Sequence, residues 1–153
     1  MGKKTEALIG AVKEYTLACA LPAAEITNIQ MENKKLQAEN AQQIKIMDDV
    51  NEQYMPGGHR TAGSEQLVEN DKRNVAAVKI LEKNTKILMG NLAQMTKRKG
   101  ELDAVTPKFK AKLGELEKLI AGKVKDKANA GKYAKVLAFI DSSKELLAAV
   151  VKL

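Results

Sequence analysis

Few side chains in this 153-residue sequence have the type and spacing that chemistry requires. The single histidine, His59, has no cysteine or carboxylate at metal-ligand spacing, so the sequence predicts neither a zinc site nor a histidine-based catalytic centre. Residues 58–64 have the glycine spacing of a phosphate-binding loop, but the lysine that would reach the phosphates is missing. We therefore expect a protein that is not an enzyme and that uses no cofactor, metal ion or small-molecule substrate.

The only cysteine, Cys19, continues an apolar helical stripe that includes Leu8, Val12 and Tyr15. A cysteine in such a stripe behaves as a small hydrophobic residue, so we expect a buried structural thiol. A reactive or lipidated thiol is the alternative. A single cysteine excludes a disulfide within the chain.

The net charge of +7 is carried mostly by lysine and is concentrated toward the C-terminus. Lysine is a solvated point charge, which favours diffuse attraction to an anionic surface over specific base or phosphate contacts. Two interpretations stay open: a solvated helix face, or a site for nucleic acid, an anionic membrane or an acidic protein. The candidate residues are Lys108, Lys110, Lys112, Lys118, Lys123, Lys125, Lys127, Lys132 and Lys135.

Apolar residues are plentiful, but the first apolar segment is interrupted by Lys13 and Glu14. We found no uninterrupted apolar stretch of the roughly 18–20 residues that a membrane span needs. We therefore expect no transmembrane helix and no cleaved signal peptide. The expected location is the cytoplasm or a particle that assembles inside the cell.

Two long segments carry the three-and-four spacing of a coiled-coil seam, and no segment reads as a strand. In the first arm the predicted seam is Ile26, Ile29, Asn33, Leu36, Asn40, Gln43, Met47, Val50 and Tyr54. In the second arm it is Leu67, Asp71, Asn74, Val78, Leu81, Thr85, Leu88, Leu92, Met95, Lys99 and Leu102. A glycine-rich segment, 56–63, separates the arms, so they should fold back as an antiparallel hairpin.

Three polar residues, Asn33, Asn40 and Gln43, lie together in the middle of the first seam. Pairing the two predicted seams places Asn33 opposite Leu88 and Asn40 opposite Leu81, so the amides should face apolar residues. Polar seam residues can fix the register or the partner of a coiled coil at the expense of stability. Simple exposure of a poorly buried stretch is the alternative.

The sequence predicts an all-α fold: a long antiparallel coiled-coil-like hairpin with flanking shorter helices, forming an elongated bundle. We expect a single domain, 1–153, with an N-terminal helix at 4–21, the hairpin at 23–104 and basic C-terminal helices at 107–153. Pro22 should mark a break or kink, and Thr106 should cap a new helix that begins at Pro107. The tip, 56–63, is either a simple connector or a docking loop, its candidate residues being Gly57, Gly58, His59 and Arg60.

These features favour a structural or interaction protein: a helical spacer, an adaptor or an assembly subunit, including a subunit of a virus-like or secretion-type particle. Self-association or a protein partner is therefore expected. One alternative is a nucleic-acid-binding accessory protein that uses its lysine-rich C-terminal third. Another is a helical protein that coats a membrane or a granule.

Overall fold

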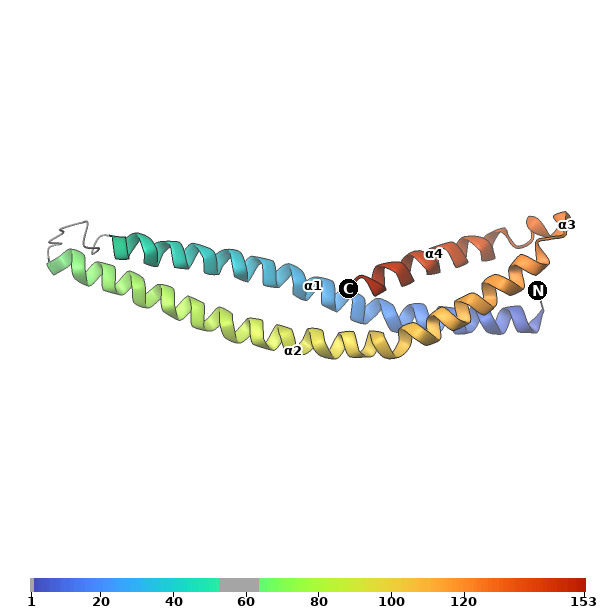
Figure 1. The fold of residues 1–153 in the computed structure, drawn as a ribbon, viewed down its shortest axis with the longest axis horizontal. Coiled ribbons are helices and arrows are strands. Elements are labelled where there is room, and N and C mark those ends of the chain that lie inside the picture. Colours follow the sequence, from blue (N-terminus) through green and yellow to red (C-terminus); the bar gives the residue numbers. More distant parts are fainter. Residues whose placement is uncertain (1, 53–63) are drawn as a thin grey trace. The chain divides into compact units, whose positions relative to one another are not determined.

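The computed structural model describes residues 2–52 and 64–153, and these residues form helices joined by short turns (Figure 1). The helices are α1 (Lys3–Glu52), α2 (Ser64–Lys123), α3 (Lys127–Ala130) and α4 (Ala134–Val151). The described residues contain no strand. The predicted all-α class, with two long packed helices and shorter flanking ones, is confirmed.

Both long helices pass through a proline, which corrects two predicted boundaries. α1 continues through Pro22, and α2 continues through Pro107. The hydroxyl of Thr106 does not cap a new helix. It donates a 2.6 Å hydrogen bond to the carbonyl of Leu102, one turn earlier in the same helix. A proline inside a helix removes one backbone hydrogen bond and costs about 3 kcal/mol, so packing must offset that cost here.

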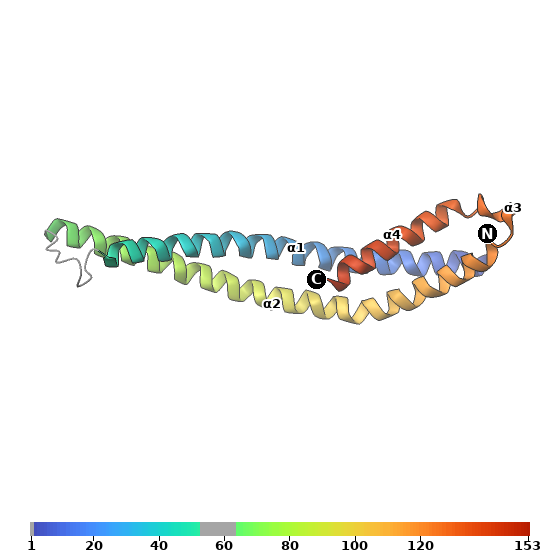
Figure 2. The ribbon, with the colours of Figure 1, turned by 45° about the horizontal axis from the view of Figure 1, so that its top comes forward.

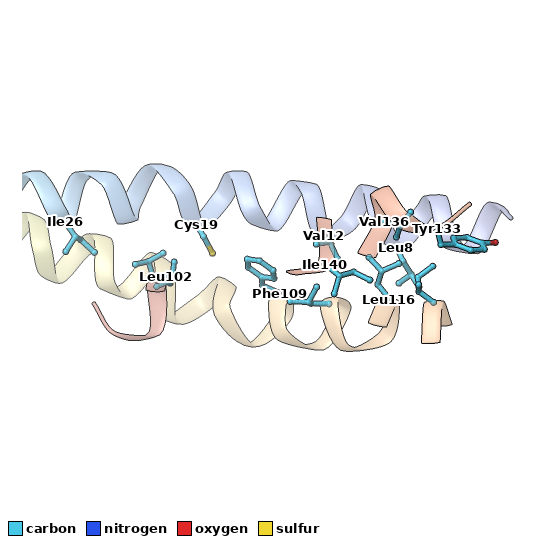
Figure 3. Close-up of a cluster of buried hydrophobic side chains, with 13 residues drawn as sticks. Leu8, Val12, Cys19, Ile26, Leu102, Phe109, Leu116, Tyr133, Val136 and Ile140 are labelled. Carbon is cyan, nitrogen blue, oxygen red and sulfur yellow. The ribbon is translucent and has the colours of Figure 1, made fainter. Parts of the chain in front are cut away.

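The chain divides into two compact units. The first unit comprises residues 1–27 and 95–153, and the second comprises residues 28–94. The first unit packs the start of α1, the end of α2, and α4 around an apolar core (Figure 3). Its fully or nearly buried members are Leu8, Val12, Cys19, Ile26, Leu102, Phe109, Leu113, Leu116, Ile120, Tyr133, Val136, Ile140 and Val150.

Helical periodicity explains most of this core. Phe109, Leu113, Leu116 and Ile120 share one face of α2, as their spacing predicts, and all four are buried. The buried face of α4 includes one polar residue, Ser143, beside Val136, Ile140 and Val150, whereas the apolar residues Leu137 and Val151 are exposed. The Ser143 hydroxyl has no hydrogen-bond partner among the described atoms.

The second unit is a pair of antiparallel arms, one from α1 and one from α2, which lie side by side in both views (Figures 1 and 2). Among its described side chains, only Val50, Asn70, Ala77 and Asn84 are buried. Two of these four are asparagines. The seam of this unit is therefore far more polar than the core of the first unit.

Candidate interaction surfaces

Two asparagine pairs bridge the arms of the second unit. The Nδ2 amide of Asn91 donates to Oδ1 of Asn33 across 2.8 Å, and Nδ2 of Asn84 donates to Oδ1 of Asn40 across 2.9 Å. Within each arm the two asparagines are seven residues apart in sequence, which is one heptad, so the pairs form equivalent layers of one antiparallel seam. Each of these partly or fully buried amides thus faces another amide, which can satisfy it.

This geometry corrects the predicted register by three residues. Asn33 and Asn40 do not face Leu88 and Leu81, because their partners lie at 91 and 84. The predicted seam of the first arm agrees with the observed burial over the described residues. In the second arm, five of the eleven predicted seam positions are one residue away from the residue that faces the first arm. The wrongly chosen positions are exposed: Asp71, Val78, Thr85, Leu92 and Lys99. Their inward neighbours are Asn70, Ala77, Asn84, Asn91 and Arg98.

Gln43 lies one seam position beyond Asn40 and is half-buried. The register set by the asparagine pairs places it level with Leu81, which is also half-buried. The structure therefore brings Asn33 and Asn40 into matching layers, and it places Gln43 in an adjacent layer of mixed polarity.

The displaced positions of α2 belong to a second stripe of large apolar residues, which we call the outer row. It runs along α2 beside the seam, again in steps of three and four. Its apolar members, with the exposed fraction of each, are Val68 (53%), Val75 (53%), Val78 (38%), Met89 (66%) and Leu92 (65%). Asp71, Glu82 and Thr85 interrupt the row.

One residue of α1 extends this apolar surface. Ile44 is 50% exposed and directly follows the seam residue Gln43, as Val78 directly follows Ala77. In an antiparallel coiled coil these flanking positions lie on the same side of the seam. The second unit therefore presents one face with more exposed large hydrophobic residues than an isolated hairpin needs.

A charged cluster lies in the first unit, around Arg98, one of the inward-facing residues of α2. Arg98 forms an ion pair with Glu25 of α1, and its Nη1 atom donates to both carboxylate oxygens of Glu101 at 3.0 and 3.1 Å. The hydrogen bond that Arg98 donates to Glu101, together with the charges of the Glu101 and Glu25 carboxylates, raises the pKa of Arg98. This cluster was not among the sites predicted from the sequence, although Glu25, Arg98 and Glu101 lie close to seam positions.

The structure divides the nine candidate lysines into two groups. Lys108, Lys110 and Lys112 lie on α2 about 16–23 Å from its end, given a rise of 1.5 Å per residue. Lys112 contacts Glu115 across 3.5 Å. The remaining six lie within or after the last two turns of α2 and are exposed, except for Lys123, which is half-buried.

The tip residues Gly57, Gly58, His59 and Arg60 lie outside the described residues, as does the rest of 56–63. The described residues contain no cluster of three or more histidine, cysteine or acidic side chains that could hold a metal ion.

In the first unit, an open hollow of about 320 Å³ adjoins Pro107 and is lined by Thr106, Val150 and Leu153, among others. Lys99 and Asp103 at its rim form no constellation typical of catalysis.

Cys19 is fully buried, as predicted, and burial raises the pKa of its thiol.

α1 also includes one window whose length and mean hydropathy, 1.2, would suffice to cross a membrane, although no such window was expected from the sequence. One such helix is weak evidence for a membrane span, because core helices of soluble proteins and signal sequences near an N-terminus pass the same test. In this helix, Leu8, Val12, Cys19 and Ile26 belong to the core of the first unit.

Comparison of the chain with protein-family models, with curated proteins and with solved structures finds no match.

Proposed function

We propose that this protein is a non-enzymatic helical assembly subunit or spacer, whose hairpin holds a fixed register and packs against a further helix. The observation that carries this proposal is the pair of asparagine layers, Asn33–Asn91 and Asn40–Asn84. A seam built only for stability would have aliphatic residues there, each contributing roughly 1.5–3 kcal/mol when buried. Amide pairs contribute less, but they disfavour any register that separates them.

The outer row supports the second half of the proposal. Val75, Val78 and Met89 remain 38–66% exposed although they follow a regular helical spacing. A two-helix unit with apolar residues beside its seam resembles part of a larger bundle, in which another helix covers the row. A second copy of the chain is the simplest such helix, because most oligomers of soluble proteins are homo-oligomers.

Sedimentation velocity over a range of protein concentrations tests the proposal. We expect the wild-type chain to self-associate, and we expect Val78→Lys combined with Met89→Lys to shift it toward monomer. The matched control is Ala76→Lys with Gln94→Lys, which adds the same charge to exposed positions of the same helix outside the row. The control should associate like the wild type. A wild-type chain that stays monomeric, or a control that dissociates equally, would contradict assembly through the outer row.

A further inference from the structure

One end of the first unit gathers lysines that are far apart in the sequence. The start of α1, the end of α2, α3 and the start of α4 lie at this same end in both views (Figures 1 and 2). We call this region the basic end. Its lysines are Lys3, Lys4, Lys118, Lys123, Lys125, Lys127, Lys132 and Lys135. Lys3 and Lys4 were not predicted as part of this surface, because only folding brings the N-terminal turn beside the C-terminal lysines.

Few acidic residues neutralise this charge. The segments that form the basic end, 2–6 and 118–136, contain only two acidic residues, Glu6 and Asp126. The Asp126 carboxylate caps α3 by accepting a 3.1 Å hydrogen bond from the backbone N–H of Ala128, and it keeps its negative charge, so eight lysines face two carboxylates. The ion pairs found among the described residues use Arg98, Lys112 and Lys144, and none uses a lysine of the basic end.

Helix stability does not explain three of these lysines. Lys3 and Lys4 occupy the first turn of α1, and Lys135 occupies the first turn of α4, which holds no acidic residue. The macrodipole makes a helix N-terminus favourable for acidic side chains and unfavourable for lysine, by about 0.3–1 kcal/mol per charge. At these three positions, positive charge therefore lies where folding alone would favour the opposite sign, whereas Lys123 occupies the last turn of α2, where the macrodipole favours lysine.

The chemistry of the basic end selects among anionic ligands. Its only aromatic residue, Tyr133, is 4% exposed, so it offers no ring on which an unpaired base could stack. Among the described residues of segments 2–6 and 118–136, none is an exposed large hydrophobic residue that could insert into a bilayer, Leu137 of α4 being the nearest in sequence. What this surface offers is a set of solvated lysine ammonium groups, which suit regularly spaced phosphates.

We propose that the basic end binds the phosphate backbone of double-stranded nucleic acid without sequence preference. This site is separate from the outer row, so it adds a ligand to the proposed assembly function and does not depend on it. Binding would release counterions from the duplex, and its affinity would fall steeply with salt, the slope being set by the number of phosphates contacted.

Fluorescence anisotropy with a short labelled DNA duplex, repeated with a second duplex of unrelated sequence, tests this inference. The test variant changes four lysines of the basic end: Lys4→Gln, Lys125→Gln, Lys127→Gln and Lys132→Gln. The matched control changes four exposed lysines of the second unit: Lys34→Gln, Lys72→Gln, Lys83→Gln and Lys86→Gln. Both variants carry the same net charge, and circular dichroism confirms that each folds.

We expect the wild type and the control to bind both duplexes equally well at low salt. The test variant should lose roughly tenfold or more in affinity, and each lost contact should reduce the slope of log K against log salt by about 0.9. The inference is overturned if the wild type does not bind, if the two variants weaken binding equally, or if the two duplexes differ strongly. It is also overturned if the chain binds phosphatidylserine vesicles under conditions where it ignores DNA.

Discussion

The contribution of Asn40 to stability depends on its partner across the seam, Asn84. The side chain of Asn40 is half-buried, while its partner Asn84 is 2% exposed. Considered alone, Asn40 is a polar residue at a seam position, where a leucine would add to the free energy of unfolding. Considered with Asn84, it satisfies a buried amide, and a buried amide without a partner costs about 1–3 kcal/mol.

We therefore expect Asn40→Leu to lower the free energy of unfolding by about 1–3 kcal/mol, because it leaves the Asn84 amide without its partner. Asn40→Leu with Asn84→Leu should recover that loss, because an apolar layer replaces the amide layer. Urea denaturation of both variants measures the effect. Asn28→Leu, at an exposed position of α1, is the control and should change stability by no more than about 0.5 kcal/mol. Stabilisation by the single Asn40 change would contradict the role of the pair.

Cys19 gives a prediction that depends on pH. Burial raises the pKa of its thiol in the folded chain, so the unfolded chain loses this proton first as the pH rises. The corresponding stability is fully present below the unfolded pKa of about 8.5 and is lost as the pH rises from there through the folded pKa.

The stability difference between the wild type and Cys19→Ala should therefore shrink between neutral and alkaline pH. Urea denaturation of both proteins at a series of pH values measures it, and the other titrating groups cancel in the difference. A difference that is constant over this range would show that the thiol keeps its ordinary pKa in the folded state.

At the scale of elements, helix type and core faces followed from the spacing of apolar residues, while the register of the hairpin did not. Phe109, Leu113, Leu116 and Ile120 are all buried, as their period requires. In the second arm, however, the pattern could be aligned on Val78 and Leu92 or on their neighbours Ala77 and Asn91. Apolar character favoured the first choice, but amide pairing across the arms favours the second. The pairing of amides depends on both arms at once, so the sequence of one arm alone does not reveal it.

The continuity of the long helices was missed for a related reason. Proline disfavours a helix interior locally, but packing of the flanking turns can override that preference. Cys19 and Ile26 lie in the core on either side of Pro22, and Leu102 and Phe109 do so on either side of Pro107. The basic end was missed in part because it needs the first turn of α1 beside α3, and only tertiary structure supplies that neighbour.

The two prolines should respond differently to replacement. Pro107→Ala removes an exposed ring and restores a backbone hydrogen bond to the carbonyl of Asp103, so it should stabilise the chain by up to about 3 kcal/mol. Pro22→Ala restores the equivalent bond but deletes a buried ring, so its gain should be smaller. Thermal unfolding followed by circular dichroism compares them. Destabilisation by Pro107→Ala would mean that the helix does not continue through residue 107 in solution. Equal stabilisation by the two variants would mean that the buried ring of Pro22 contributes nothing to packing.

At the scale of the whole molecule, burial is divided unevenly between the units. All thirteen residues of the apolar core cluster belong to the first unit. The second unit buries only Val50, Asn70, Ala77 and Asn84 among its described side chains. Local stability follows the amount of buried apolar surface, so the second unit should open at a lower free energy than the first.

Hydrogen exchange followed by mass spectrometry should show this difference directly. At low protein concentration we expect amides in 28–50 and 68–94 to exchange faster than those in 8–26, 102–120 and 136–150. If another copy covers the outer row, the protection of 68–94 should rise with protein concentration, because association stabilises only the folded hairpin. Val78→Lys with Met89→Lys should abolish this rise and leave the exchange of the first unit unchanged. Uniform protection of both units at low concentration would show that the hairpin needs no further helix, and would remove the physical reason for assembly through the outer row.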